Sequence, residues 1–294
     1  MRHLSLIAGA ALCLIVPVLA HQLQAGGQQQ QAPARPGVQV GVPDGRGGAP
    51  APPGGGRGRQ AGPPQAPPRN AAGRVLLGGA TPAQRNGVWL PGGTPVNATN
   101  MKDIPFQPWA RGVVADRDLN ELEPHTRCKP SGVTRPFLTP YGVEFVELPE
   151  LQRIYIFDIG GPHTWRTIYM DGRSHPLNLA PSYYGHSIGW WEGDTLVIDT
   201  IGFNEGFWLD RLGSPHTEKL HTLERLTRTD LNVIQYDVTI DDPGAYTKPW
   251  KSGFNLRWDP NVELFEYVCQ QANYAHELMV GSNDSVDRRS PIVP

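Results

Sequence analysis

Imidazoles and carboxylates are unusually dense in one part of this chain, and they are the residues most able to do chemistry. Between positions 186 and 224 the chain carries His186, Glu192, Asp194, Asp199, Asp210, His216, Glu218, His221 and Glu224. Burial and neighbouring charges bring the pKa values of such groups toward neutrality, where they transfer protons. The segment therefore predicts an acid/base site or a polar binding site, and a purely structural use of the same groups is the competing interpretation.

Two of these groups lie in runs that read as strands. A period of two places the His186 ring on the face of Ile188 and Trp190, and an inward face would put an imidazole in an aromatic-lined cavity. A hydrogen-bonded core histidine is the alternative. Asp199 needs a cationic partner in a strand that reads as buried, as a structural ion pair or an active-site acid. The predicted catalytic set is His186, Asp199, Asp210 and Glu224.

Aromatic side chains near these groups predict a ligand site. Aromatic rings stack on apolar and aromatic ligands, and a few polar groups then fix the orientation of the ligand. The predicted ligand-binding set is Trp190, Trp191, Trp208, Tyr183, Tyr184 and Arg225. Packing of the same rings on the rim of a β-structure is the alternative.

A metal site is a further hypothesis, at His216, Glu218 and His221. His216 and Glu218 share a face of an extended chain, whereas Glu218 and His221 share a face of a helix. No single regular conformation presents all three, and the spacing is not that of the HExxH zinc motif. A polar loop is the alternative. The sequence shows no phosphate loop, dinucleotide fingerprint or haem motif, so no cofactor is predicted.

The elements that must position these residues read as strands joined by hairpins. Apolar and β-branched residues alternate from Gly142 onward, and turn signals such as Glu192-Gly193-Asp194 separate the runs. About eight or nine short strands without a βαβ rhythm predict a mainly β fold. Closure removes open edges, so we expect an antiparallel meander that closes into a small lipocalin-like barrel, with one or two short helices before it. A β-sandwich is the runner-up.

The first third of the chain predicts export and a tether. Residues 1–20 read as a signal peptide, with an apolar run and Val18-Leu19-Ala20 before the cleavage point. Residues 21–98 are rich in Gly, Pro and Gln and predict a disordered tether. Residues 99–294 form the predicted barrel domain. We expect a secreted or periplasmic protein without a membrane span in its mature form; a signal retained as an anchor is the alternative.

The cysteines agree with an oxidising compartment. Cys13 falls in the predicted signal, which leaves Cys128 and Cys269 as an even pair. We expect a disulfide between them, with two buried free thiols as the alternative. The net charge is −2 with both signs mixed along the chain, so no nucleic-acid partner is predicted.

One segment resembles a known family. The run from Gly185 to Thr200, GHSIGWWEGDTLVIDT, and the following Gly202-Phe203-Asn204 are similar to a GxSxGxWEGDTLVVDT–GFN core found in an uncharacterised family of secreted bacterial proteins. Trp190 departs from the family pattern, in which that position is often basic. The resemblance implies export but no activity, cofactor or site residue.

Four functions remain open on these grounds. The first is a barrel that binds a small apolar or aromatic molecule in an internal pocket. The second is an acid/base enzyme, a lyase, isomerase or hydrolase, that uses His186 with a nearby carboxylate. The third is a metal-dependent enzyme, and the fourth is an envelope protein whose barrel is filled with side chains.

Overall fold

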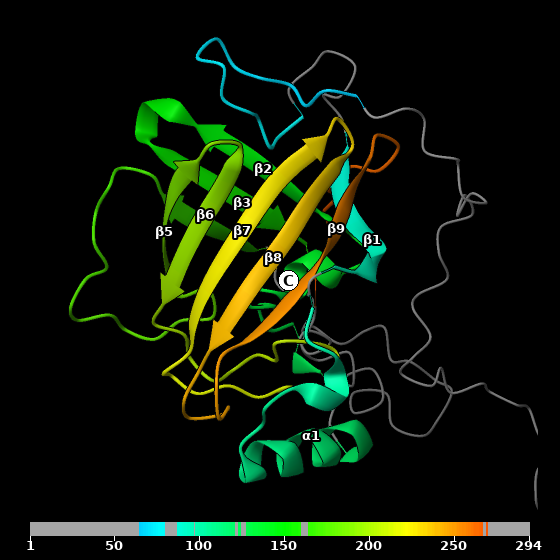
Figure 1. The fold of residues 1–294 in the computed structure, drawn as a ribbon, viewed down its shortest axis with the longest axis vertical. Coiled ribbons are helices and arrows are strands. Elements are labelled where there is room, and N and C mark those ends of the chain that lie inside the picture. Colours follow the sequence, from blue (N-terminus) through cyan, green and yellow to red (C-terminus); the bar gives the residue numbers. More distant parts are fainter. Residues whose placement is uncertain are drawn as a thin grey trace, which may run out of the picture. The chain divides into compact units, whose positions relative to one another are not determined.

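The fold is a closed β-barrel of nine strands (Figure 1). The computed structural model describes residues 65–79, 87–96, 98–120, 123–124, 128–159, 164–266 and 269. Its elements are β1 (Val88–Pro95), η1 (Met101–Asp103), α1 (Pro108–Asn120), η3 (Arg135–Leu138), β2 (Val143–Leu148), η4 (Pro149–Leu151), β3 (Arg153–Asp158), β4 (Thr164–Tyr169), β5 (His186–Glu192), β6 (Thr195–Ile201), β7 (His221–Asp230), β8 (Val233–Asp241) and β9 (Trp250–Asp259).

The strands follow one another around the barrel in chain order. Seven of the sequential pairings from β1 to β9 are antiparallel, and β1 also pairs with β9, which closes the barrel. The exception is β4 with β5, which pair in parallel because residues 170–185 carry the chain back along the barrel. The predicted mainly β barrel is thus confirmed, with this one departure from a simple meander.

Local sequence explains the hairpins. Gly193 has a φ of +59° in the turn between β5 and β6, a conformation that glycine adopts without strain. Along β7 and β8 buried residues alternate with partly exposed ones, as expected when one face of each strand faces the interior. Mainly apolar side chains from all nine strands fill the core.

The barrel begins earlier than the composition predicts. β1 lies within residues 21–98, the predicted tether, and residues 68–76 also contact one another through a bridge between Arg69 and Val75. Val75, Leu77, Val88 and Trp89 are fully buried. These few large apolar residues are diluted by Gly and Pro, so a prediction from composition passes over them. The predicted signal peptide and residues 21–64 of the tether lie outside the described residues.

The predicted disulfide is confirmed. Cys128 and Cys269 are bonded, with their Cα atoms 5.6 Å apart and a sequence separation of 141. In the described part of the chain, no helix has the length and apolar character needed to cross a membrane. The one α-helix among the described residues, α1, lies near the end of the barrel where β8 ends and β9 begins (Figure 1).

Candidate functional site

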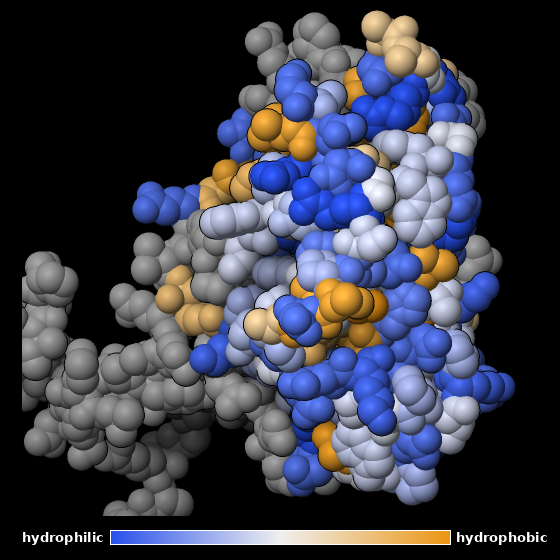
Figure 2. Space-filling view, turned by 90° about the vertical axis from the view of Figure 1, so that its left-hand side faces the viewer, coloured by the Kyte–Doolittle hydropathy of each residue, from blue (hydrophilic) through white to orange (hydrophobic). Residues whose placement is uncertain are grey.

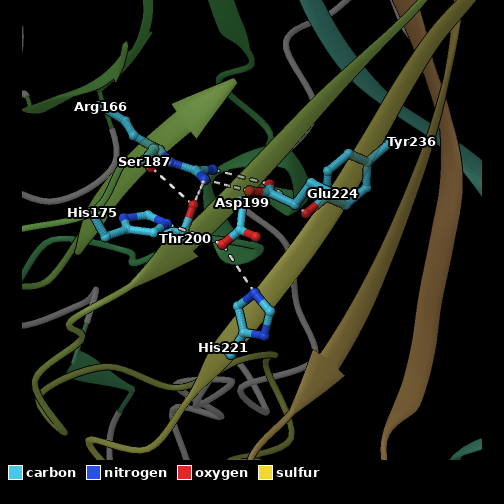
Figure 3. Close-up of polar contacts among 8 residues, drawn as sticks. All are labelled: Arg166, His175, Ser187, Asp199, Thr200, His221, Glu224 and Tyr236. Carbon is cyan, nitrogen blue, oxygen red and sulfur yellow. Dashed lines mark hydrogen bonds and ion pairs between the residues drawn. The ribbon is translucent and has the colours of Figure 1, made fainter. Parts of the chain in front are cut away.

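A buried ion pair crosses the interior of the barrel (Figure 3). Arg166 on β4 donates from Nη1 to Oε1 of Glu224 on β7 at 3.0 Å, and from Nη2 to the other carboxylate oxygen. Arg166 also donates to the hydroxyls of Ser187 and Thr200, at 2.9 Å and 2.6 Å. The Tyr236 hydroxyl donates to Glu224 at 2.9 Å. These contacts satisfy the charges of both partners, so the pair is a structural crosslink between β4 and β7.

The Arg166–Glu224 pair is shielded from solvent. The Glu224 side chain has no exposed surface, and Arg166 is almost fully buried. Burial raises the pKa of Tyr236 well above its usual value, and the nearby Glu224 carboxylate raises it further. Of the predicted catalytic residues, Glu224 is therefore held away from any substrate that approaches from solvent.

A second polar cluster lies on the opposite, outer face of the same strands. Asp199 on β6 accepts hydrogen bonds at one oxygen, Oδ1, from His221 Nε2 at 3.0 Å and from His175 Nε2 at 3.1 Å. His175 comes from the loop between β4 and β5, and its Nδ1 lies 2.8 Å from Nδ1 of His186 on β5. Figure 3 shows His175 and His221 on either side of the Asp199 carboxylate. We call these four residues the outer histidine cluster.

Charge and burial set the protonation of this cluster. Hydrogen bonding from His221 is the main cause that lowers the pKa of Asp199, and the same bond raises the pKa of His221. Burial lowers the pKa of His186, and the neighbouring His175 and Arg173 lower it further. At neutral pH the cluster therefore combines an ionised carboxylate with a neutral His186 imidazole.

The prediction that His186 and Trp190 face an internal cavity is wrong. Ser187 points inward, where it meets Arg166, so its neighbour His186 points outward and stacks on Tyr169 with ring centroids 5.0 Å apart. Trp190 is on the outer face too, and 39% of it is exposed. The hydrophobic pattern misassigns the faces because the barrel interior here contains a charged pair.

The other predicted ligand-binding residues are dispersed. Trp191 packs against the core under the guanidinium of Arg74, 4.7 Å from its ring centroid. Trp208 is buried beneath Arg117. The remaining members have separate contacts: Tyr183 packs against Gly206, the Tyr184 hydroxyl donates to Asp158, and Arg225 pairs with Glu192 on the outer surface. These residues do not line one shared pocket.

The three predicted metal ligands do not converge. His216 is buried against the Phe207 ring, and its Nε2 lies 3.1 Å from the Phe207 carbonyl oxygen. His221 faces Asp199 on the outer surface, and Glu218 is exposed. Burial lowers the pKa of His216 to about 4. Within the described part of the chain, no group of three or more His, Cys, Asp or Glu side chains is arranged to hold a metal ion.

A large cavity lies at the end of the barrel where β8 ends and β9 begins. It has a volume of about 700 Å³. Apolar side chains form much of its wall, namely Leu138, Leu209, Ile240, Trp250 and Phe254. Polar groups also line it, and among them are Thr134, Ser252 and the predicted catalytic residue Asp210. Asp210 accepts a hydrogen bond from the Ser214 hydroxyl at 2.5 Å, which fixes its carboxylate at the cavity wall.

Sequence reasoning missed most of this site. The cavity residues come from separate segments between positions 91 and 254, and only the closed fold brings them together. His175 lies in a loop without periodicity, so no pattern in the sequence relates it to Asp199. Comparison of the chain with family models, with curated proteins and with solved structures gives no match. The resemblance to the secreted bacterial family therefore stays a prediction.

Proposed function

We propose that this protein is an exported β-barrel that binds a small, mainly apolar molecule in the cavity at the end of the barrel. The observation that carries the proposal is the cavity itself. Its volume of about 700 Å³ falls in the range of about 300–1,000 Å³ that is usual for small-molecule sites. Apolar walls with a few fixed polar groups are typical of such sites.

The chemistry of the wall indicates the kind of ligand. Trp250 and Phe254 offer aromatic surface for stacking, and Leu209 and Ile240 offer aliphatic surface. Asp210 and Thr134 supply oxygen atoms that can orient a polar group of the ligand. A compact aromatic or alicyclic molecule with one or two polar substituents fits this combination.

Export rests on two separate features. The apolar start of the chain has the pattern of a cleavable signal peptide. The bond between Cys128 and Cys269 is of the kind that persists in oxidising compartments. Both support a protein that works outside the cytoplasm.

A fluorescence titration with the apolar probe N-phenyl-1-naphthylamine tests the binding proposal. Ser252 lines the cavity from β9, so Ser252→Phe fills part of its volume without removing core atoms. Lys251 is exposed on the same strand, and Lys251→Phe is the matched control because it adds the same side chain outside the cavity. We expect saturable binding to the unmodified protein and to Lys251→Phe, and at least about tenfold weaker binding to Ser252→Phe, or about 1.4 kcal/mol. Equal binding by all three proteins would rule out this cavity.

A further inference from the structure

The outer histidine cluster has a hydrogen-bond order that fixes where its protons lie. Asp199 is ionised and can only accept, so His175 must donate its Nε2 proton to it. A neutral His175 then has a lone pair on Nδ1, which accepts the proton on Nδ1 of His186. This order leaves Nε2 of His186 as the nitrogen with a free lone pair.

That order produces a polarised base. A carboxylate behind a histidine orients the ring and stabilises the positive charge that forms when the imidazole takes up a proton. Here the effect of Asp199 reaches His186 through His175, because each ring is hydrogen-bonded to the next group. The His186 side chain is only partly buried, so its ring can be reached from solvent.

We propose that His186 is the general base of a second site, on the outer face of the barrel, that hydrolyses carboxylic esters. Asp199 and His175 are positioning residues that act through His186. This proposal does not depend on ligand binding in the end cavity, because none of the residues involved lines that cavity.

A cation near His186 suits the charge that develops in ester hydrolysis. The Arg173 guanidinium lies 4.1 Å from the centroid of the Tyr169 ring, on which His186 also stacks, and its Nε and Nη2 donate to the Asp171 carboxylate. Arg173 is exposed, and its Nη1 is the guanidinium nitrogen that is not bound to Asp171, so it can donate to the oxyanion of a tetrahedral intermediate. The side of the barrel on which β5 lies is mostly hydrophilic, which favours polar esters over lipid-like ones (Figure 2).

The reaction balances with water alone. Nε2 of His186 removes one proton from a water molecule while the water oxygen bonds to the acyl carbon. The bond between the acyl carbon and the alkoxy oxygen then breaks, and the leaving alkoxide takes the same proton from Nε2. The products are the carboxylic acid and the alcohol, and His186 returns to its neutral form.

Hydrolysis of p-nitrophenyl acetate by the full-length protein tests the proposal. We expect His186→Ala to lower the protein-catalysed rate at least about tenfold, since general-base catalysis typically contributes about 10²–10⁴-fold. Ile188→Ala is the matched control on the same face of β5, with a rate within twofold of the unmodified protein. Ser252→Phe separates the two sites, because it changes the end cavity and leaves the ester rate unchanged.

The pH profile distinguishes positioning from a merely structural role. Asp199→Asn replaces the carboxylate that orients the His175 ring, so the hydrogen bond between His175 and His186 is weakened and the plateau of the rate profile falls. Carbethoxylation of His186 in the unmodified protein should abolish ester hydrolysis, and hydroxylamine should restore it. This test does not depend on whether a substituted chain folds. An unchanged rate after His186 is modified, or an unchanged profile for Asp199→Asn, would overturn the proposal.

Discussion

Removal of one partner from the buried Arg166–Glu224 pair should be among the most destabilising single changes in this protein. Arg166→Met leaves the Glu224 carboxylate with no exposed surface and, among the described residues, with the Tyr236 hydroxyl as its remaining hydrogen-bond donor. Leaving one charge of a buried pair without its partner costs about 3–5 kcal/mol. A domain of ordinary stability has only about 5–15 kcal/mol to lose.

The double variant makes this prediction sharp. When Glu224→Leu is added to Arg166→Met, no uncompensated charge remains, and the main residual cost is the Tyr236 hydroxyl without an acceptor, about 1–3 kcal/mol. The double variant should therefore be more stable than Arg166→Met alone. Urea unfolding of the unmodified protein, the two single variants and the double variant, all oxidised and followed by tryptophan fluorescence, gives the four free energies. The reasoning is refuted if the stability losses of the two single variants sum to the loss of the double variant, or if Arg166→Met loses less than about 1 kcal/mol.

Three further predictions concern stability. Folding lowers the pKa of His216 from 6.5 to about 4, so the unfolded chain binds more protons than the folded chain between these pH values. The free energy of unfolding should therefore drop by about 3 kcal/mol as the pH falls through this window. Urea titrations at several pH values measure this dependence, and His216→Gln should flatten it. Replacement of both Cys128 and Cys269 by alanine should cost up to about 4–5 kcal/mol in the same assay, because the bond closes a long loop; a loss near zero would contradict this. Gly132→Ala should cost about 1–3 kcal/mol, because the added Cβ would lie 2.1 Å from the Phe207 ring and the residue has a φ of +74°. An unchanged melting temperature would contradict this, since it would mean that the Phe207 ring moves aside without cost.

The strands could be predicted because their turns are encoded locally. Glu192-Gly193-Asp194 and Asp230-Leu231-Asn232 each separate two alternating runs, and both mark hairpins of the barrel. β1 could not be found by the same means, because its partners β2 and β9 are distant in sequence and its Gly and Pro content resembles that of a tether.

The faces of the strands were harder to predict than the strands themselves. Alternation divides a strand into two faces but does not say which one is inside. In β5 the large side chains of His186 and Trp190 suggest the inner face, yet Ser187 takes it, because the barrel interior beside it holds Arg166 and Glu224. The inner and outer faces of β5 are therefore the reverse of those predicted on the assumption that the barrel interior is apolar.

The candidate site depended on tertiary structure for a similar reason. Asp199 was predicted to need a cationic partner, and the structure supplies the imidazoles of His221 and His175. His221 was a predicted metal ligand, and His175 was not predicted at all. Only the pairing of β6 with β7 and the return of the loop before β5 place these rings beside one carboxylate.

Native mass spectrometry of the protein purified from its own host tests the central claim most directly, because it detects whatever small molecule occupies the cavity. The account predicts one apolar molecule per chain, present in the unmodified protein and in Lys251→Phe and absent from Ser252→Phe. A bare chain that also fails to take up any member of a panel of small aromatic and alicyclic compounds, or a bound molecule that Ser252→Phe retains, would contradict it.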